Sequence, residues 1–114
     1  GGGTSVRAGS HLVAARILAE SEPDGMSCEE IGQAARDATQ DFPVREVIGN
    51  AGDALFMHPH LVHGSSFNMN KAVRMACNRC VGLDQSMNFH REREEDYSLV
   101  EWAVRDCVPV PVVN

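Results

Sequence analysis

Apolar stretches alternate with polar, turn-forming stretches in the first part of the chain, and two of the apolar stretches predict helices. Residues His11 to Glu20 are rich in Ala, Leu and Arg, which are good helix formers. Ser27 and Glu30 have the S-x-x-E spacing of a capping box. A second helix should therefore begin there and end near Thr39.

The rest of the chain has mostly the pattern of short strands separated by turns. Four segments of the chain are strand candidates: Thr4–Ala8, Val44–Ile48, Ala54–His63 and Lys71–Leu83. Pro59 predicts an irregular end for the third strand, and the turn-rich segment Gly64–Asn70 separates it from the fourth. Ser98 and Glu101 form a second capping box, which predicts a final helix.

Composition and charge narrow the classes of function. The 114 residues suffice for one small domain, and no repeat or boundary divides them. The formal net charge of −6 argues against nucleic acid and against an anionic membrane surface, because both attract basic faces. No apolar run is long enough to span a membrane, and no secretory signal opens the chain. We therefore expect an intracellular protein, cytoplasmic or peroxisomal, whose cysteines are reduced thiols.

His63 and Arg74 are the main candidates for a functional site. If the last two predicted strands form a hairpin about Asn68 and Met69, His63 and Arg74 lie opposite each other. Their Cβ atoms would then be about 5 Å apart on one face of the sheet. An imidazole is a good ligand for iron, and a guanidinium binds a carboxylate through two parallel hydrogen bonds. Ser65 could donate a further hydrogen bond to the same carboxylate.

The sequence around these residues resembles a known family. Residues 52–83, GDALFMHPHLVHGSSFNMNKAVRMACNRCVGL, are similar to the final sheet segment of the phytanoyl-CoA dioxygenase family. Residues 1–11 resemble the G-G-x-x-x-x-x-G-S-H segment of that family, although Ala8 replaces the usual proline. Residues 87–104 are similar to the tail of one branch of it.

The resemblance implies a fold, an activity and a set of site residues. The expected fold is mainly β, a partial double-stranded β-helix or jelly roll with its later strands only and with helices outside. The expected activity is that of a non-haem Fe(II)- and 2-oxoglutarate-dependent dioxygenase, which hydroxylates a small organic or acyl substrate. Its H-G-S motif would place an iron ligand at His63, and Arg74 with Ser65 would bind the co-substrate.

One departure from the family pattern concerns the iron. The family takes its first two iron ligands from an H-x-D motif upstream of the G-S-H segment, and these 114 residues contain no H-x-D. The His90-Arg91-Glu92 triplet resembles H-x-D in spacing. It follows Arg74 in the chain, whereas the family's motif precedes the G-S-H segment, so we do not interpret it as part of the iron site. The parent protein is therefore expected to be an enzyme, and this polypeptide, the C-terminal part of the domain, is expected to be inactive alone.

Other interpretations of the same residues stay open. The chain could be a non-catalytic remnant that binds a partner or associates with itself through open sheet edges, or a small cupin-like metal-binding domain. A zinc site at His58, His60 and His63 is disfavoured, because strand alternation separates His63 from the other two. Cys77 and Cys80 form a single C-x-x-C, which is too few ligands for structural zinc, so packing thiols are expected.

Overall fold

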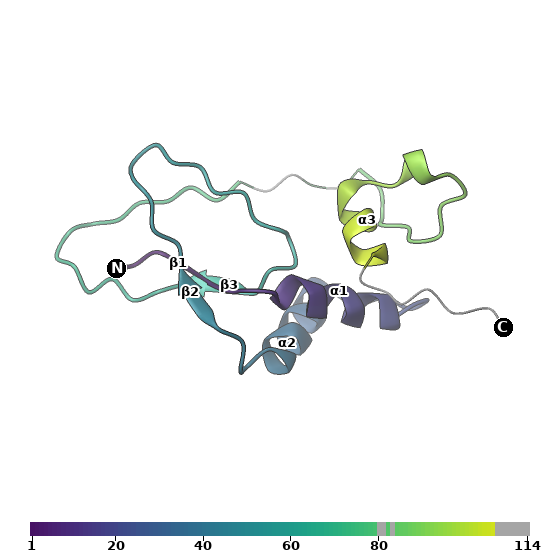
Figure 1. The fold of residues 1–114 in the computed structure, drawn as a ribbon, viewed down its shortest axis with the longest axis horizontal. Coiled ribbons are helices and arrows are strands. Elements are labelled where there is room, and N and C mark those ends of the chain that lie inside the picture. The colour runs from purple at the N-terminus through teal and green to yellow at the C-terminus, as the bar shows by residue number, and fades with distance from the viewer. Residues whose placement is uncertain (80–81, 83, 107–114) are drawn as a thin grey trace.

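The computed structural model describes residues 1–79, 82 and 84–106. Within these residues, three α-helices lie on one side of a small antiparallel sheet, and long loops spread from the other side (Figure 1). The elements in chain order are β1 (Thr4–Arg7), α1 (Ser10–Glu20), α2 (Cys28–Ala38), β2 (Val44–Glu46), β3 (His63–Ser65), the short 3-10 helix η1 (Glu94–Asp96) and α3 (Leu99–Arg105).

The sheet has the strand order β2-β1-β3, with both pairs antiparallel. The central strand β1 places Val6 opposite Arg45 on β2 and opposite His63 on β3. Backbone hydrogen bonds extend the β1–β3 pairing at both ends, from Gly2 N to the Phe67 carbonyl oxygen and from Arg7 N to the Val62 carbonyl oxygen. The first residues of the chain therefore hold β3 in place.

Both predicted capping boxes are present. The Ser27 side chain accepts a hydrogen bond from Glu30 N at the start of α2, and the Glu30 carboxylate accepts one from Ser27 N. Ser98 and Glu101 make the same reciprocal pair at the start of α3. Gly9, with a φ of 87°, lets the chain turn directly from β1 into α1.

The buried apolar residues lie at the junction of the helices. Ala15 and Leu18 on α1 and Val104 on α3 form the core cluster. Ala35 contributes the buried face of α2, and α1 packs against both α2 and α3. The core of the described chain is thus built between helices, and the sheet contributes little to it.

A buried carboxylate joins α3 to the segment before it. Glu101 is 1% exposed and accepts hydrogen bonds from the Arg91 guanidinium, at 2.7 and 3.1 Å, and from Asn88 N, at 2.6 Å. The hydrogen bonds from Arg91 lower the pKa of Glu101 to about 2, with smaller contributions from Asn88 N and Ser98. The segment from Asn88 to Arg91 is therefore fastened to the first turn of α3.

The expectation of a mainly β fold, a partial jelly roll, is wrong for the part of the chain that the structure describes. The helices have 11, 11 and 7 residues, whereas the strands have 4, 3 and 3. The strand predicted at 54–63 is reduced to its last residue, where β3 begins. Residues 71–79 of the fourth predicted strand form no regular structure, and residues 80, 81 and 83 lie outside the described chain.

The contacts of Asn68 help explain why the predicted hairpin does not form. Its side-chain amide donates to the Ala72 carbonyl oxygen at 2.9 Å, and its side-chain oxygen accepts from Asn70 N at 3.0 Å. These bonds satisfy local backbone groups within a loop, and such Asn bonds compete with the hydrogen bonds of a β-ladder. The following residues consequently do not return alongside β3, which pairs with β1 instead.

Candidate functional site

His63 is the first residue of β3 and is exposed. Its Nδ1 lies 2.8 Å from the Leu61 carbonyl oxygen. Because a carbonyl oxygen can only accept, Nδ1 carries the ring proton and Nε2 keeps its lone pair. A hydrogen bond of this kind, from the second ring nitrogen to a backbone carbonyl, is usual for histidines that bind metals. His63 is therefore suited to donate one imidazole ligand through Nε2.

The backbone that carries His63 is held from two sides. Val62 N donates a hydrogen bond to the Ser10 hydroxyl at 2.8 Å, and the Val62 carbonyl oxygen accepts one from Arg7 N at 2.9 Å. Ser10 is 0% exposed, so this bond is shielded from water. The G-S-H segment at the start of α1 thus orients the H-G-S segment of β3.

Ser65 lies within β3, opposite Thr4, and not on a loop after it as expected from the sequence. Residues two apart on a strand project to the same face, so the side chains of Ser65 and His63 share one face of the sheet. Gly64 between them points to the other face, where an added Cβ would meet no atom within 4 Å. The H-G-S motif therefore presents a hydroxyl and an imidazole side by side.

Arg74 does not lie opposite His63, because the predicted hairpin is absent and Val6 occupies that position. Arg74 is an exposed residue of the loop that follows β3. It lies close enough to Glu46 for its charge to contribute to a lowered pKa of that carboxyl, whose main causes are hydrogen bonds from Ser66 and from Gly3 N. No cross-strand pairing of Arg74 with His63 is therefore formed.

A histidine cluster that the sequence interpretation missed lies beside this sheet. The ring centroids of His11 and His58 are 5.2 Å apart, and those of His58 and His60 are 5.3 Å apart. His58 and His60 are joined by His11 from the first turn of α1. No signal in the sequence predicts this contact, because the segments of His11 and His58 come together only through the tertiary contact between Ser10 and Val62.

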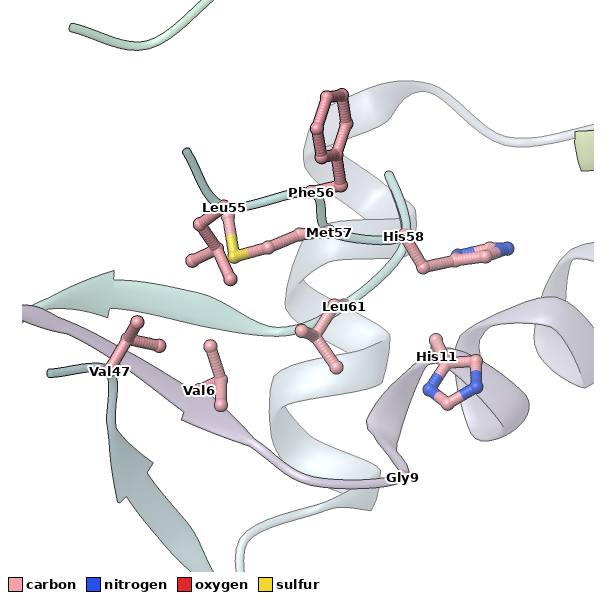
Figure 2. A pocket seen from close by; sticks show the side chains of 9 residues that line it. All are labelled: Val6, Gly9, His11, Val47, Leu55, Phe56, Met57, His58 and Leu61. Atoms are coloured by element: carbon pink, nitrogen blue, oxygen red, sulfur yellow. The ribbon is translucent and has the colours of Figure 1, made fainter. Parts of the chain in front are cut away.

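A mainly apolar cavity of about 250 Å³ adjoins this cluster (Figure 2). Val6 and Leu61 line it from the sheet side, and Leu55 and Met57 line it from the loop before β3. His11 and His58 stand together at one end of the cavity (Figure 2). Since Val6 is the cross-strand partner of His63, the cavity lies next to the strand that carries the candidate ligand.

The described residues do not assemble a metal site. Among residues 1–79, 82 and 84–106, no group of three or more His, Cys, Asp or Glu side chains is arranged to hold a metal ion. Cys77 is exposed, so the expectation that it is a packing thiol is wrong, and Cys28 is exposed as well. Cys80 and Cys107 lie outside the described residues.

His90, the first residue of the His90-Arg91-Glu92 triplet, pairs with the carboxylate of Glu22 at 2.7 Å.

Comparison with known proteins decides the family. The sequence model of phytanoyl-CoA dioxygenase (PhyH) matches residues 1–76. The chain belongs to the phytanoyl-CoA dioxygenase family. The match contains the G-S-H segment, the H-G-S motif and Arg74, so the similarity noted at residues 1–11 and in the first part of 52–83 is confirmed. The similarity of residues 87–104 to one branch of the family lies beyond the match and stays a prediction.

The other comparisons add no relative. No curated protein and no solved structure matches the chain. No helix formed by the described residues is long and apolar enough to cross a membrane. The family assignment of the chain therefore rests on the match over residues 1–76.

Proposed function

We propose that this chain is part of an Fe(II)- and 2-oxoglutarate-dependent dioxygenase that acts on a small organic or acyl substrate. Membership of the phytanoyl-CoA dioxygenase family supports the reaction class. The observation that carries the site assignment is the geometry of His63, whose Nδ1 is engaged by the Leu61 carbonyl oxygen and whose Nε2 is left for iron. Bound iron would use dioxygen and 2-oxoglutarate to hydroxylate a C–H bond of the substrate.

The donor set of the described residues fits iron only in part. His63 supplies one imidazole, and a 2-His-1-carboxylate site needs two further ligands. The described residues offer no three-ligand group, and the H-x-D motif is missing from the 114 residues. We therefore assign His63 as one ligand and expect the chain to need the other two from elsewhere in the parent protein.

Arg74 and Ser65 are the proposed contacts of 2-oxoglutarate. The guanidinium can donate two parallel hydrogen bonds to the far carboxylate of the co-substrate, and the Ser65 hydroxyl can donate a third. Ser65 already shares a face with His63. Arg74 lies on the exposed loop after β3, so the proposal requires its guanidinium to reach that face when the site is complete.

The experiment that tests this proposal uses the isolated chain and the complete parent protein. Succinate release is measured with Fe(II) and 2-oxoglutarate present. We expect no turnover by the 114 residues and clear turnover by the parent protein. In the parent protein, His63→Gln should abolish turnover and weaken Fe(II) binding, whereas His90→Gln, at an exposed histidine outside the site, should not. Robust turnover by the isolated chain, or normal iron binding by His63→Gln, would contradict the proposal.

A partner-binding module is the second candidate function. Its support is a set of large apolar side chains that point into solvent on the two long loops: Phe56 is 96% exposed, Phe67 90% and Met75 90%. The sheet also has two edge strands, β2 and β3. Exposed apolar groups of this size commonly mark contacts with another chain.

A further inference from the structure

Three imidazole rings meet where the first turn of α1 contacts the segment that leads into β3. They belong to His11, His58 and His60, and we call them the histidine cluster. Each ring has one nitrogen that is buried and finds no hydrogen-bond partner among the residues that the structure describes: Nδ1 of His11, Nε2 of His58 and Nδ1 of His60. Unpartnered buried nitrogens are costly, and a charge on them is more costly still.

The hydrogen bonds of the cluster require a neutral ring at His58. Its Nδ1 accepts a hydrogen bond from His60 N at 3.2 Å. An accepting Nδ1 places the ring proton on Nε2, because a neutral imidazole has one donor and one acceptor. When the ring takes up a second proton, Nδ1 becomes a donor and faces the backbone N–H. Protonation therefore breaks the bond that holds the two histidines together.

The groups that face the cluster give no compensation for a positive charge. His11 faces His58 from α1, and His60 faces His58 from the same segment of the chain. Arg7, at the end of β1, directs its guanidinium to Arg36 and Thr39 on the α2 side. Within the described chain, the only histidine in an ion pair with a carboxylate is His90. Among the described residues, the charges that act on His58 and His60 are therefore those of other imidazoles.

Burial accordingly favours the neutral rings. Burial lowers the pKa of His58 from its ordinary value of 6.5, and the neighbouring His11 lowers it further. Burial also lowers the pKa of His60, and His58 adds to that effect. Because the unfolded rings bind protons at a higher pH, the folded arrangement has its full stability above pH 6.5 and loses stability as the pH falls below it.

The cluster is connected to β3 by a short series of backbone bonds. Leu61 N donates to the His58 carbonyl oxygen at 3.0 Å and closes a turn. Val62 N, the next residue, donates to the buried hydroxyl of Ser10 in the same turn of α1 that carries His11. β3 begins one residue later, at His63. Any repulsion between His11 and His58 therefore acts directly on the contact that holds the start of β3.

We propose that the histidine cluster is a pH-sensitive latch, in which proton uptake in mildly acidic solution releases residues 58–62 from α1 and loosens β3. The latch does not depend on iron or on the proposed oxygenase activity, since it uses none of the proposed ligands. If closing the latch lowers the pKa of one histidine by one unit, the equilibrium constant for the closed latch falls about tenfold at low pH.

The test measures amide hydrogen exchange by NMR on the whole chain, in EDTA, at pH 7.5, 6.5 and 5.5. After correction for intrinsic exchange rates, the protection factors of Val62 N and Ser66 N should fall severalfold between pH 7.5 and 5.5. The double variant His58→Gln/His60→Gln should show a much smaller fall. The matched control His90→Gln should behave as the unchanged chain does, because His90 is exposed and pairs with Glu22.

A direct titration covers the case in which the double variant does not fold. In the unchanged chain, the ring protons of His58 and His60 should titrate below the ordinary histidine pKa of 6.5. Equal protection of Val62 N at pH 7.5 and 5.5 would overturn the proposal. So would ring titrations of His58 and His60 at or above the ordinary histidine pKa of 6.5. A pH response that occurs only when EDTA is left out would point to a bound metal ion and would also overturn the latch.

Discussion

At the scale of single residues, the H-G-S motif at His63 and Ser65 could be found in the sequence, but the residues that lie beside it could not be predicted. The H-G-S spacing identifies the motif, but Ser65 was expected on a loop, whereas it lies in β3 on the same face as His63. The predicted cross-strand partner of His63, Arg74, was wrong, because Val6 pairs with His63 from β1. The contact of His11 with His58 could not be predicted either, since it depends on how α1 meets a loop 47 positions later in sequence.

The role of Arg74 is tested by Arg74→Lys in the complete protein. Lysine keeps the positive charge but cannot donate two parallel hydrogen bonds to one carboxylate. We expect the KM for 2-oxoglutarate to rise by about tenfold, the value for one lost hydrogen bond to a charged group, while Fe(II) affinity changes little. Steady-state kinetics and metal titration measure the two effects. The control is Arg79→Lys, at an exposed arginine of the same loop; an unchanged KM for Arg74→Lys would remove Arg74 from the site.

The buried pair of Arg91 and Glu101 gives a prediction about stability and pH. Arg91→Leu leaves the carboxylate of Glu101 buried without its main partner, which should cost about 3 kcal/mol of unfolding free energy at pH 7. The control Arg93→Leu breaks only an exposed pair with Asp96 and should cost much less, because solvent screens that pair. Urea denaturation measures both.

The pH dependence of that effect follows from the lowered pKa of Glu101. The folded-state pKa is about 2 against an ordinary value of 4.5, so the pair contributes its full stability above pH 4.5 and loses it as the pH falls toward 2. The difference between Arg91→Leu and the unchanged chain should therefore shrink when urea denaturation is repeated at pH 3. A difference that grows as the solution becomes more acidic would contradict this assignment.

At the scale of elements, the helices were predictable from local signals and most of the strands were not. Capping boxes and helix-forming residues act within one turn, so both predicted N-terminal boundaries of α2 and α3 are confirmed. A strand exists only if another strand pairs with it, and composition does not name that partner. Segments 54–62 and 71–79 have the composition of strands but find no partner in the described chain, and so they form loops.

The cap of α3 provides a test at this scale. Ser98→Ala removes the hydroxyl that accepts from Glu101 N and should lower the unfolding free energy by about 1 kcal/mol. Ser98→Asp should restore most of that loss, because aspartate also accepts at this position. Ser86→Ala, at an exposed serine outside any helix, is the control. Thermal denaturation followed by circular dichroism measures all three; equal midpoints for Ser98→Ala and Ser86→Ala would exclude a contribution from the cap.

At the scale of the whole molecule, the chain is elongated, and the residues that the structure describes include few buried apolar side chains. Its principal extents are 60 × 30 × 22 Å, and its core cluster of buried residues holds only Ala15, Leu18 and Val104. Most of the large exposed apolar residues belong to loops, among them Phe56, Phe67 and Met75, and the long loops lie beside the sheet (Figure 1). The described fold thus leaves uncovered much of the apolar surface that a stable domain would bury.

This surface predicts that the chain associates with itself or with another chain. Burying exposed groups such as Phe67 and Met75 would be favourable by roughly 25 cal/mol per Å² of apolar area. Sedimentation velocity over a range of concentrations should therefore show oligomers that dissociate on dilution. Phe67→Glu together with Met75→Glu should shift the distribution toward the monomer, because two buried carboxylates oppose the contact. Glu29→Gln, on the exposed face of α2, should leave it unchanged. A chain that stays monomeric at every concentration would show that these side chains do not drive association.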